Sequence, residues 1–184
     1  MDDRRTELVA AARDLYDEKG LTKTTVKDIA DRCGVTRSLF YHYFSDKDAI
    51  TSAVLDDYVD DFTEATQLWN ENRTRHDVEG ALRDCIKMVR RITFDSSRFR
   101  RMIASNENAS LYLDFLSRAT ETLAAYVVDT TVQDYKQFHT VEIDHVKETF
   151  YVLIFGLVGY LRNNPEVEDE VLMGIVAQTL RLDL

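Results

Sequence analysis

Residues that break helices are scarce in this sequence. Its 184 residues include a single proline, Pro165, and only six glycines. A fold made of many short strands needs many turns, and turns depend heavily on glycine and proline. No segment shows a convincing strand pattern. The sequence therefore predicts an all-α protein with about nine helices.

The helical spacing of apolar residues gives expected boundaries for these helices. Ser45 followed by Asp48 predicts a capping box at the start of the fourth helix. Pro165 suits the first turn of the last helix, where the amide that it lacks would be unpaired anyway. The expected helices cover about residues 3–19, 26–33, 36 onward, 45–69, 77–94, 97–104, 110–138, 142–162 and 165–181.

The net charge of −10 is unevenly distributed along the chain. Residues 1–48 hold 9 Lys/Arg and 10 Asp/Glu, whereas residues 49–184 hold 14 and 23. An acidic chain can still bind nucleic acid, because the local placement of cations decides such binding. We expect two domains with this boundary, a small one at 1–48 and a larger one at 49–184.

Targeting and redox features favour a cytoplasmic protein. The charged N-terminus is not followed by the apolar stretch of a signal peptide, and no apolar run is long enough to cross a bilayer. Cys33 and Cys85 are too few for a disulfide framework, so we expect both to be reduced thiols.

Two short helices joined by a tight turn are the most informative feature of the small domain. Residues 24–47 read TTVKDIADRCGVTRSLFYHYFSDK. Thr25 with Asp28 predicts a capping box. Gly34 is placed where the turn requires a positive φ, and Ala30 is small where two helices cross closely. This arrangement is typical of a helix-turn-helix, which places its second helix in the major groove of DNA.

The same segment resembles the signature of the tetracycline-repressor (TetR) family. A first helix ending near Gly20-Leu21 is followed by T-T-V-x-x-I-A, by G-V-T-x-x-x-F-Y-x-Y-F and by S-x-K. The resemblance is specific over about residues 5–55, and beyond them only the length and the helix layout agree. It implies a DNA-binding three-helix domain, a larger helical domain for dimerisation and ligand binding, and a homodimer that represses a palindromic operator until a ligand binds.

The resemblance also implies which residues contact DNA. Phosphate contacts are implied for Thr25, Tyr41, His42 and Lys47. The positions that face the major groove hold Arg37, Ser38 and Leu39, and Lys27 and Thr36 complete the expected DNA side. Ser38 and Leu39 stand where the family more often has glycine and threonine. Since Leu39 cannot donate a hydrogen bond, we expect it to make apolar contact, as with a thymine methyl.

The last two expected helices carry apolar residues on more than one face, which indicates burial on several sides. In the first of them, one face holds Val146, Phe150, Leu153, Leu157 and Leu161. We predict an isologous dimer through a four-helix bundle, with an interface that includes Val152, Gly156, Gly159, Val171 and Ile175. The alternative is that both faces belong to the core of one subunit.

Large aromatic and flexible side chains are frequent in the middle helices. With tyrosine hydroxyls as polar handles, such side chains suit an apolar pocket. We predict that a small, largely apolar ligand contacts Phe62, Phe99, Met102, Phe115, Tyr126, Tyr151 and Phe155. For each of them, core packing is the alternative.

Two groups of metal-binding residue types are explained without a metal. An acidic stripe in the fourth helix consists of Asp56, Asp57, Asp60, Asp61 and Glu64, and we expect a solvated surface there. Glu142 and His145, with His139 nearby, have spacing that could suit zinc, but polar residues at a helix start explain them equally well. We therefore predict no metal site and no cofactor.

Other functions remain as alternatives. An enzyme is not expected, because the sequence has no glycine-rich phosphate loop after a strand, no H-E-x-x-H motif and no nucleophile elbow. A helical adaptor that binds protein instead of DNA is one alternative, and a regulator of the same family that activates transcription is another.

Overall fold

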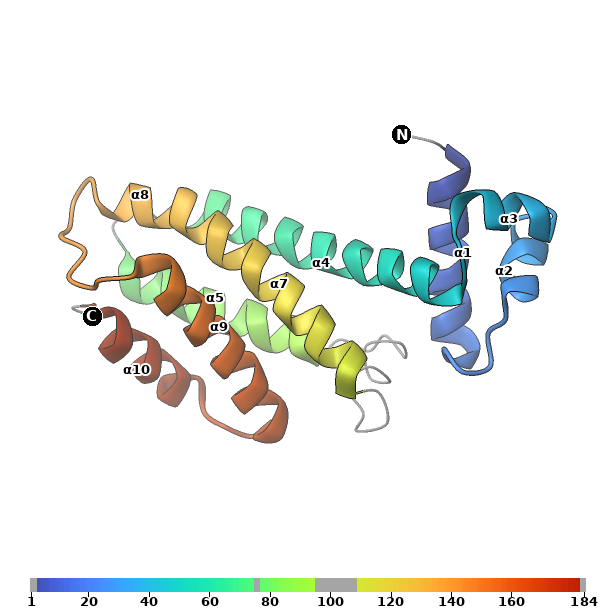
Figure 1. Ribbon diagram of the computed structural model, residues 1–184. Helices are drawn as coiled ribbons and strands as arrows, with labels where there is room; N and C mark the ends of the chain where they lie inside the picture. Colours follow the sequence, from blue (N-terminus) through green and yellow to red (C-terminus); the bar gives the residue numbers. More distant parts are fainter. Residues whose placement is uncertain (1–2, 75–76, 95–108, 183–184) are drawn as a thin grey trace. The chain divides into compact units, whose positions relative to one another are not determined.

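The computed structural model describes residues 3–74, 77–94 and 109–182. Every regular element within these ranges is an α-helix and none is a strand, which confirms the all-α prediction. The chain divides into two compact units, Met1–Tyr58 with Asp95–Phe115 and Val59–Phe94 with Leu116–Leu184 (Figure 1). No helix in the described ranges has both the length and the apolar character needed to cross a bilayer.

The first unit contains α1 (Asp3–Lys19), α2 (Val26–Arg32), α3 (Arg37–Tyr43) and the first turns of α4 (Lys47–Asn72). α1 packs on α2, and α2 packs on α3. Leu8, Ile29 and Phe40 are each at most 1% exposed in its core. Burying a side chain of this size contributes about 1.5–3 kcal/mol, so these helices are held together mainly by their shared apolar face.

Local signals end α1 and α2 and start α2 as predicted. Gly20 (φ 89°) follows α1 and Gly34 (φ 64°) follows α2, both in the left-handed region that glycine adopts without a steric penalty. The Thr25 hydroxyl accepts a hydrogen bond from the Asp28 amide at 3.2 Å, and the Asp28 carboxylate accepts one from the Thr25 amide at 2.8 Å. The predicted capping box is therefore present.

The predicted starts of α4 and α10, each of which rests on a named residue, are wrong. α4 begins at Lys47 because Asp46, not Ser45, caps it: Asp46 Oδ1 accepts from the Ala49 amide at 2.8 Å. α10 (Asp169–Leu180) begins four residues after Pro165. Pro165 instead lies in the preceding turn, where its carbonyl accepts a hydrogen bond from Arg90.

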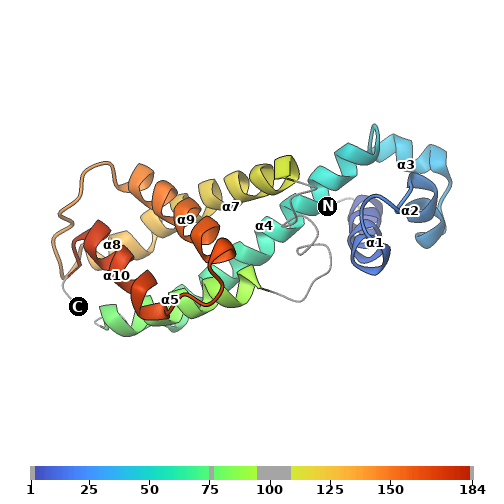
Figure 2. The same cartoon turned by 90° about the horizontal axis from the view of Figure 1, so that it is seen from below.

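The second unit contains the rest of α4, α5 (Val78–Thr93), most of α7 (Ala109–Asp129), α8 (Thr131–Tyr135), α9 (Val146–Asn163) and α10. α5 lies against both α9 and α10 (Figures 1 and 2). The core where they meet is built from Leu82, Ile86, Leu153, Leu161, Leu172, Met173 and Val176. This cluster joins apolar faces from three helices, so it fixes their mutual packing.

Three further expectations concern the middle of the chain. The single helix expected over 110–138 is interrupted at Thr130, which separates α7 from α8. α9 starts later than predicted, after His145, whose φ of 51° breaks the helical path. The helix expected over 97–104 lies outside the described residues.

Candidate nucleic-acid interface and internal cavity

α3 presents a polar and aromatic surface outside the core of the first unit. Its inner side is anchored by Phe40, which is fully buried and lies 5.8 Å from Phe44, centroid to centroid. Arg37, Ser38 and His42 are exposed, and Tyr41 is 54% exposed. A helix of seven residues thus offers guanidinium, hydroxyl and imidazole groups to a polyanion, which are common donors to phosphate and to base edges.

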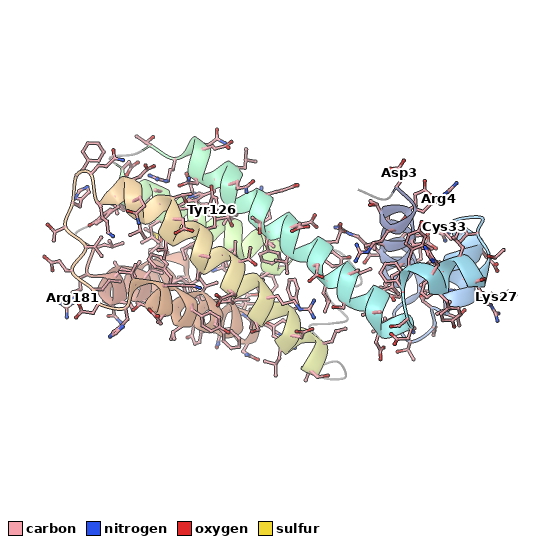
Figure 3. The ribbon with its side chains drawn as sticks, turned by 45° about the horizontal axis from the view of Figure 1, so that its top comes forward. Asp3, Arg4, Lys27, Cys33, Tyr126 and Arg181 are labelled. Carbon is pink, nitrogen blue, oxygen red and sulfur yellow. The ribbon has the colours of Figure 1, made fainter. Side chains whose placement is uncertain are left out.

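Both threonines expected on the DNA side are helix caps. The Thr36 hydroxyl accepts from the Leu39 amide at 3.2 Å and so fixes the N-terminus of α3. The Thr25 hydroxyl does the same for α2 and also donates to Asp28 Oδ2 at 2.7 Å. Near them, Lys27 points away from α2 into solvent (Figure 3).

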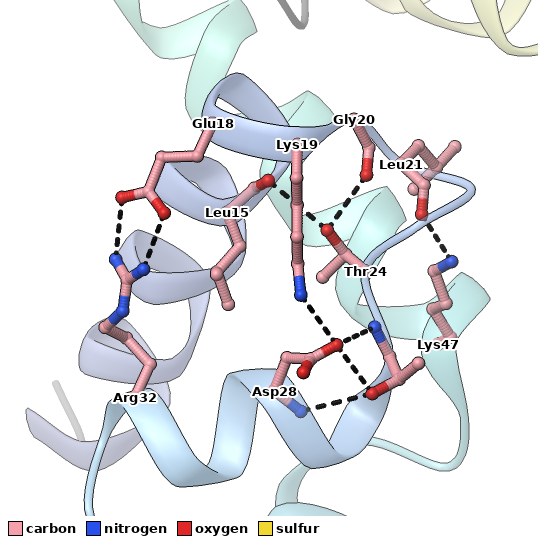
Figure 4. Close-up of polar contacts among 10 residues, drawn as sticks. Leu15, Glu18, Lys19, Gly20, Leu21, Thr24, Asp28, Arg32 and Lys47 are labelled. Atoms are coloured by element: carbon pink, nitrogen blue, oxygen red, sulfur yellow. Dashed lines mark hydrogen bonds and ion pairs between the residues drawn. The ribbon is translucent and has the colours of Figure 1, made fainter.

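Ion pairs fasten α2 to the end of α1 (Figure 4). Lys19 Nζ lies 2.8 Å from Asp28 Oδ2, and both oxygens of Glu18 accept hydrogen bonds from Arg32, at 3.0 and 2.6 Å. The Lys19 ammonium, together with the bonds from Thr25, holds the pKa of Asp28 well below its usual range. Both carboxylates therefore stay ionised at neutral pH, and the orientation of α2 is set by charged contacts as well as by its apolar face.

Lys47 holds the loop between α1 and α2. Its Nζ donates to the Leu21 carbonyl at 2.6 Å, and burial lowers the pKa of this half-buried ammonium (Figure 4). In the same loop Thr24 Oγ1 donates to the Gly20 carbonyl at 2.9 Å. An ammonium has three donors, so Lys47 can brace this loop and still offer N–H groups to a phosphate.

A cavity of about 220 Å³ lies inside the second unit. Its wall is almost entirely apolar and comes from every helix of the unit, with Leu82, Ile86, Val127, Phe150, Leu153 and Leu157 among the lining residues. Cys85 also lines it, and burial raises the pKa of that thiol to about 12. Such a cavity suits an apolar molecule, because a polar one would lose its hydrogen bonds to water on entry.

Two polar residues of the cavity wall, Arg73 and Thr131, lie just after the end of α4 and at the start of α8. Arg73 donates to Asp134 Oδ2 and to Asn70 Oδ1, each at 2.8 Å. Asn70 Oδ1 also accepts from Thr131 at 2.9 Å, and its amide donates to the Tyr126 hydroxyl at 3.3 Å. The polar atoms of Arg73 and Thr131 therefore have hydrogen-bond partners within the protein.

α9 and α10 expose an apolar face at the surface of the second unit. Val152 is 70% exposed, and Tyr160 and Val171 are each 46% exposed. Gly156, Gly159 and Gly174 have open space where a Cβ would be. Large exposed aliphatic groups beside glycines are typical of a surface that a second helix covers closely.

Comparison with known proteins shows what the first unit is. Residues 8–54 match the family model described as bacterial regulatory proteins, tetR family. We refer to the domain that contains these residues as the TetR-family domain, after the family model that it matches. In this TetR-family domain, the match covers the whole helix-turn-helix and the start of α4.

Relatives that carry a regulator's name match only part of this chain. The HTH-type transcriptional repressor KstR2 of Rhodococcus jostii is 43% identical over 58 residues, which are 32% of this chain and 28% of that protein. The HTH-type transcriptional regulator EthR of Mycobacterium tuberculosis is 33% identical over 87 residues, which are 47% of this chain and 40% of that protein. The alignments thus span less than half of either relative.

A solved structure extends the similarity in fold to the whole chain. The fatty acid degradation regulator FadR from Bacillus halodurans superposes with a TM-score of 0.61 and covers 98% of this chain and 95% of that one. Only 16% of the residues are identical. The similarity to that structure therefore lies in the fold.

The residues expected on the DNA side lie together on the TetR-family domain, on α2, α3 and the helix starts. Leu39 alone among the α3 candidates is half-buried. The expected interface residues Val152, Gly156 and Val171 are exposed, whereas Ile175 packs partly against the core. Tyr160 and Gly174 share the exposed face and were missed, although their helical spacing from Gly156 and Val171 was a usable signal.

Of the residues expected to bind a ligand, the five that the structure describes do not line the cavity. Phe62 and Phe115 are buried, and Tyr126 belongs to the polar network. Tyr151 and Phe155 stack on each other, with ring centroids 6.1 Å apart. Phe99 and Met102 lie outside the described residues. The missed signal is the face of α9 that carries Phe150, Leu153 and Leu157, which the sequence pattern had singled out as an apolar face.

Proposed function

We propose that this chain is a transcriptional regulator that binds a palindromic operator as a homodimer and responds to a small, largely apolar molecule. The observation that carries the proposal is the surface of α3, which exposes Arg37, Ser38 and Tyr41 on a TetR-family domain. The expected mode of action is repression that the ligand relieves.

In this proposal α3 enters the major groove. Arg37 pairs with a guanine edge and Leu39 contacts a thymine methyl, so these residues read sequence. Tyr41 and His42 bind phosphates, as do groups at the helix starts, among them Thr25, Lys27, Thr36 and Lys47. Phosphate contacts position the helix without reading sequence, and the free amides of a helix N-terminus favour them.

Dimerisation is proposed through the exposed face of α9 and α10. Val152 and Val171 would lose their exposure to water, and Gly156 would allow close approach of the partner helix. A two-fold dimer presents two copies of α3 in opposite orientation, and this symmetry requires an operator with two inverted half-sites.

The cavity of the second unit is the proposed ligand site. α4 contributes Thr66 and Trp69 to its wall, and the first turns of the same helix pack in the TetR-family domain, where the Tyr16 and Thr51 hydroxyls hydrogen-bond at 2.8 Å. A molecule that displaces α4 therefore acts on a helix that both units share.

Binding to DNA that flanks the protein's own gene tests this function. Fluorescence anisotropy with a labelled fragment should show binding that weakens as salt increases, and footprinting should show two inverted half-sites. Affinity no greater than for random DNA would instead support the helical adaptor. Transcription from the same fragment, with and without the protein, distinguishes a repressor from an activator.

A further inference from the structure

A second hollow lies on the outside of the second unit, between α4 and α5. Leu68, Trp69 and Asn72 line it from α4, and Lys87, Met88 and Arg91 line it from α5. Within each set the last residue follows the other two by three and four residues, which places the set on one side of its helix. We refer to this hollow as the α4–α5 groove.

The α4–α5 groove and the cavity share part of their walls. Trp69, Arg73 and Met88 line both of them. Trp69 is fixed by a hydrogen bond of 2.9 Å from Nε1 to the Ala81 carbonyl, and Arg73 is fixed by Asp134. Met88 has only an unbranched thioether, a side chain that changes shape readily. Movement of Met88 would therefore connect the groove to the cavity.

The charge of the groove is opposite to that of the chain. Lys87 and Arg91 lie one turn apart on α5. Asp84 is the one carboxylate among the residues that line the groove, and its Oδ1 lies 3.8 Å from Lys87 Nζ in an exposed, weak ion pair. In the part of the chain that the structure describes, no ion pair involves Arg91. The chain as a whole has a net charge of −10. Leu68, 59% exposed, adds an apolar surface beside these cations.

We propose that the cavity and the α4–α5 groove form one binding site for an anionic amphiphile. The hydrocarbon part fills the apolar cavity, and a carboxylate or phosphate group binds between Lys87 and Arg91 in the groove. Trp69, Arg73 and Met88 surround the junction between the two parts of the ligand. This inference names the ligand class of the proposed regulator and in that sense rests on the proposed function.

The single tryptophan makes the proposal directly measurable. Trp69 is the chain's one tryptophan and lies at the junction, so its fluorescence reports on an occupant. Three probes with the same tail are titrated below their micelle concentrations: dodecanoate, dodecyl phosphate and 1-dodecanol. We expect all three to change the emission, and the anionic probes to bind about tenfold more tightly than the alcohol. The stronger of the two anionic probes identifies the head group.

Charge reversal in the groove tests the role of the cations. Arg91→Glu should remove the preference for the anionic probes and leave the affinity for 1-dodecanol unchanged. Arg83→Glu is the matched control, since Arg83 is an exposed arginine of the same helix that pairs with Glu79 and does not line the groove. Equal affinity for dodecanoate and 1-dodecanol in the wild type, or a preference that survives in Arg91→Glu, would overturn the proposal.

Operator binding measured in parallel separates this inference from the proposed function. Operator binding by a protein whose Trp69 emission does not respond to dodecanoate or dodecyl phosphate would overturn the amphiphile site and leave the regulator in place. Tight dodecanoate binding that leaves operator affinity unchanged would support the site and overturn the proposed response to ligand.

Discussion

Arg90 of α5 holds Asp169, the first residue of α10, by a hydrogen bond of 2.8 Å from Nε to Oδ1. Its other two nitrogens donate to the carbonyls of Pro165 and Val167 in the turn before α10. A guanidinium can satisfy three acceptors at once because its donors are fixed in one plane. Arg90 thereby joins α5 to the first residue of α10 and to the turn before it.

Replacing Arg90 should therefore destabilise the protein. Arg90→Ala leaves two carbonyls and a carboxylate without their partner, and we expect the free energy of unfolding to fall by about 1–3 kcal/mol. Arg83→Ala on the same helix is the control, because its pair with Glu79 is exposed and spaced by four residues, worth about 0.5 kcal/mol or less. Urea denaturation measures both, and equal losses in the two variants would contradict the assigned role.

The Lys19–Asp28 pair predicts a specific dependence of stability on pH. The pKa of Asp28 is lower in the folded state than the value of about 3.9 expected when unfolded. The ionised Asp28 therefore stabilises the folded state fully above the pKa of the unfolded state. This contribution is lost as the pH falls below about 4, because the unfolded state takes up the proton first. The stability difference between the wild type and Asp28→Asn should shrink over this range. A difference that stays constant from neutral to acidic pH would show that the charge has no part in it.

Local signals in the sequence were sufficient for the helix-turn-helix but not for two helix starts. Gly34 and the Thr25–Asp28 box act within a few residues, so the sequence alone predicts them. At α4, adjacent Ser45 and Asp46 can both cap, and the geometry of the loop decides between them. At α10 the first residue, Asp169, is bonded to Arg90, which is 79 positions away and leaves no local signal.

The residues that line the cavity could not be predicted from residue type. Phe150 lines the cavity, whereas Tyr151, the next residue, stacks with Phe155 and hydrogen-bonds Ser117. Neighbours on a helix point about 100° apart, so an aromatic composition says nothing about which ring faces the interior. The apolar face of α9 was visible in the sequence, but its opposing helices α5 and α10 are known only from the fold.

Gly156 should be essential for dimerisation. In one subunit it has open space around it, so Gly156→Glu should leave the monomer folded while it places a charge in the proposed contact of α9 with its partner. We expect sedimentation at micromolar concentration to show a dimer for the wild type and a monomer for this variant. Thr122→Glu, an exposed change on α7, is the control and should remain dimeric. A monomeric wild type would contradict the proposed interface.

Lys47 should contribute one phosphate contact. Each neutralised phosphate adds about 0.9 to the slope of log affinity against log salt concentration. Lys47→Ala should therefore weaken binding to all sequences alike and lower the slope by about one unit. Lys136→Ala, an exposed lysine of the second unit, should leave the slope unchanged. If the slope of Lys47→Ala also stays the same, Lys47 serves only to brace the loop at Leu21.

The last prediction is that α3 reads bases through Arg37 and binds phosphate through Tyr41. Arg37 is exposed at its first turn and should read a base, so Arg37→Ala should cost about 1–3 kcal/mol and relax the preference at one position in each half-site. Tyr41 should bind a phosphate through its hydroxyl. Its ring packs edge-on against Phe40, with centroids 5.4 Å apart, so Tyr41→Phe removes the donor and keeps the packing.

Selection of bound sequences from a random library tests both variants in one experiment. Tyr41→Phe should lower the affinity for every sequence by a similar factor and return the wild-type palindrome, because a phosphate contact carries no base information. Arg37→Ala should return the same palindrome with one degenerate position per half-site. An unchanged palindrome for Arg37→Ala together with an altered one for Tyr41→Phe would reverse the two roles, since the residue that reads bases must be the one whose loss changes the selected sequence.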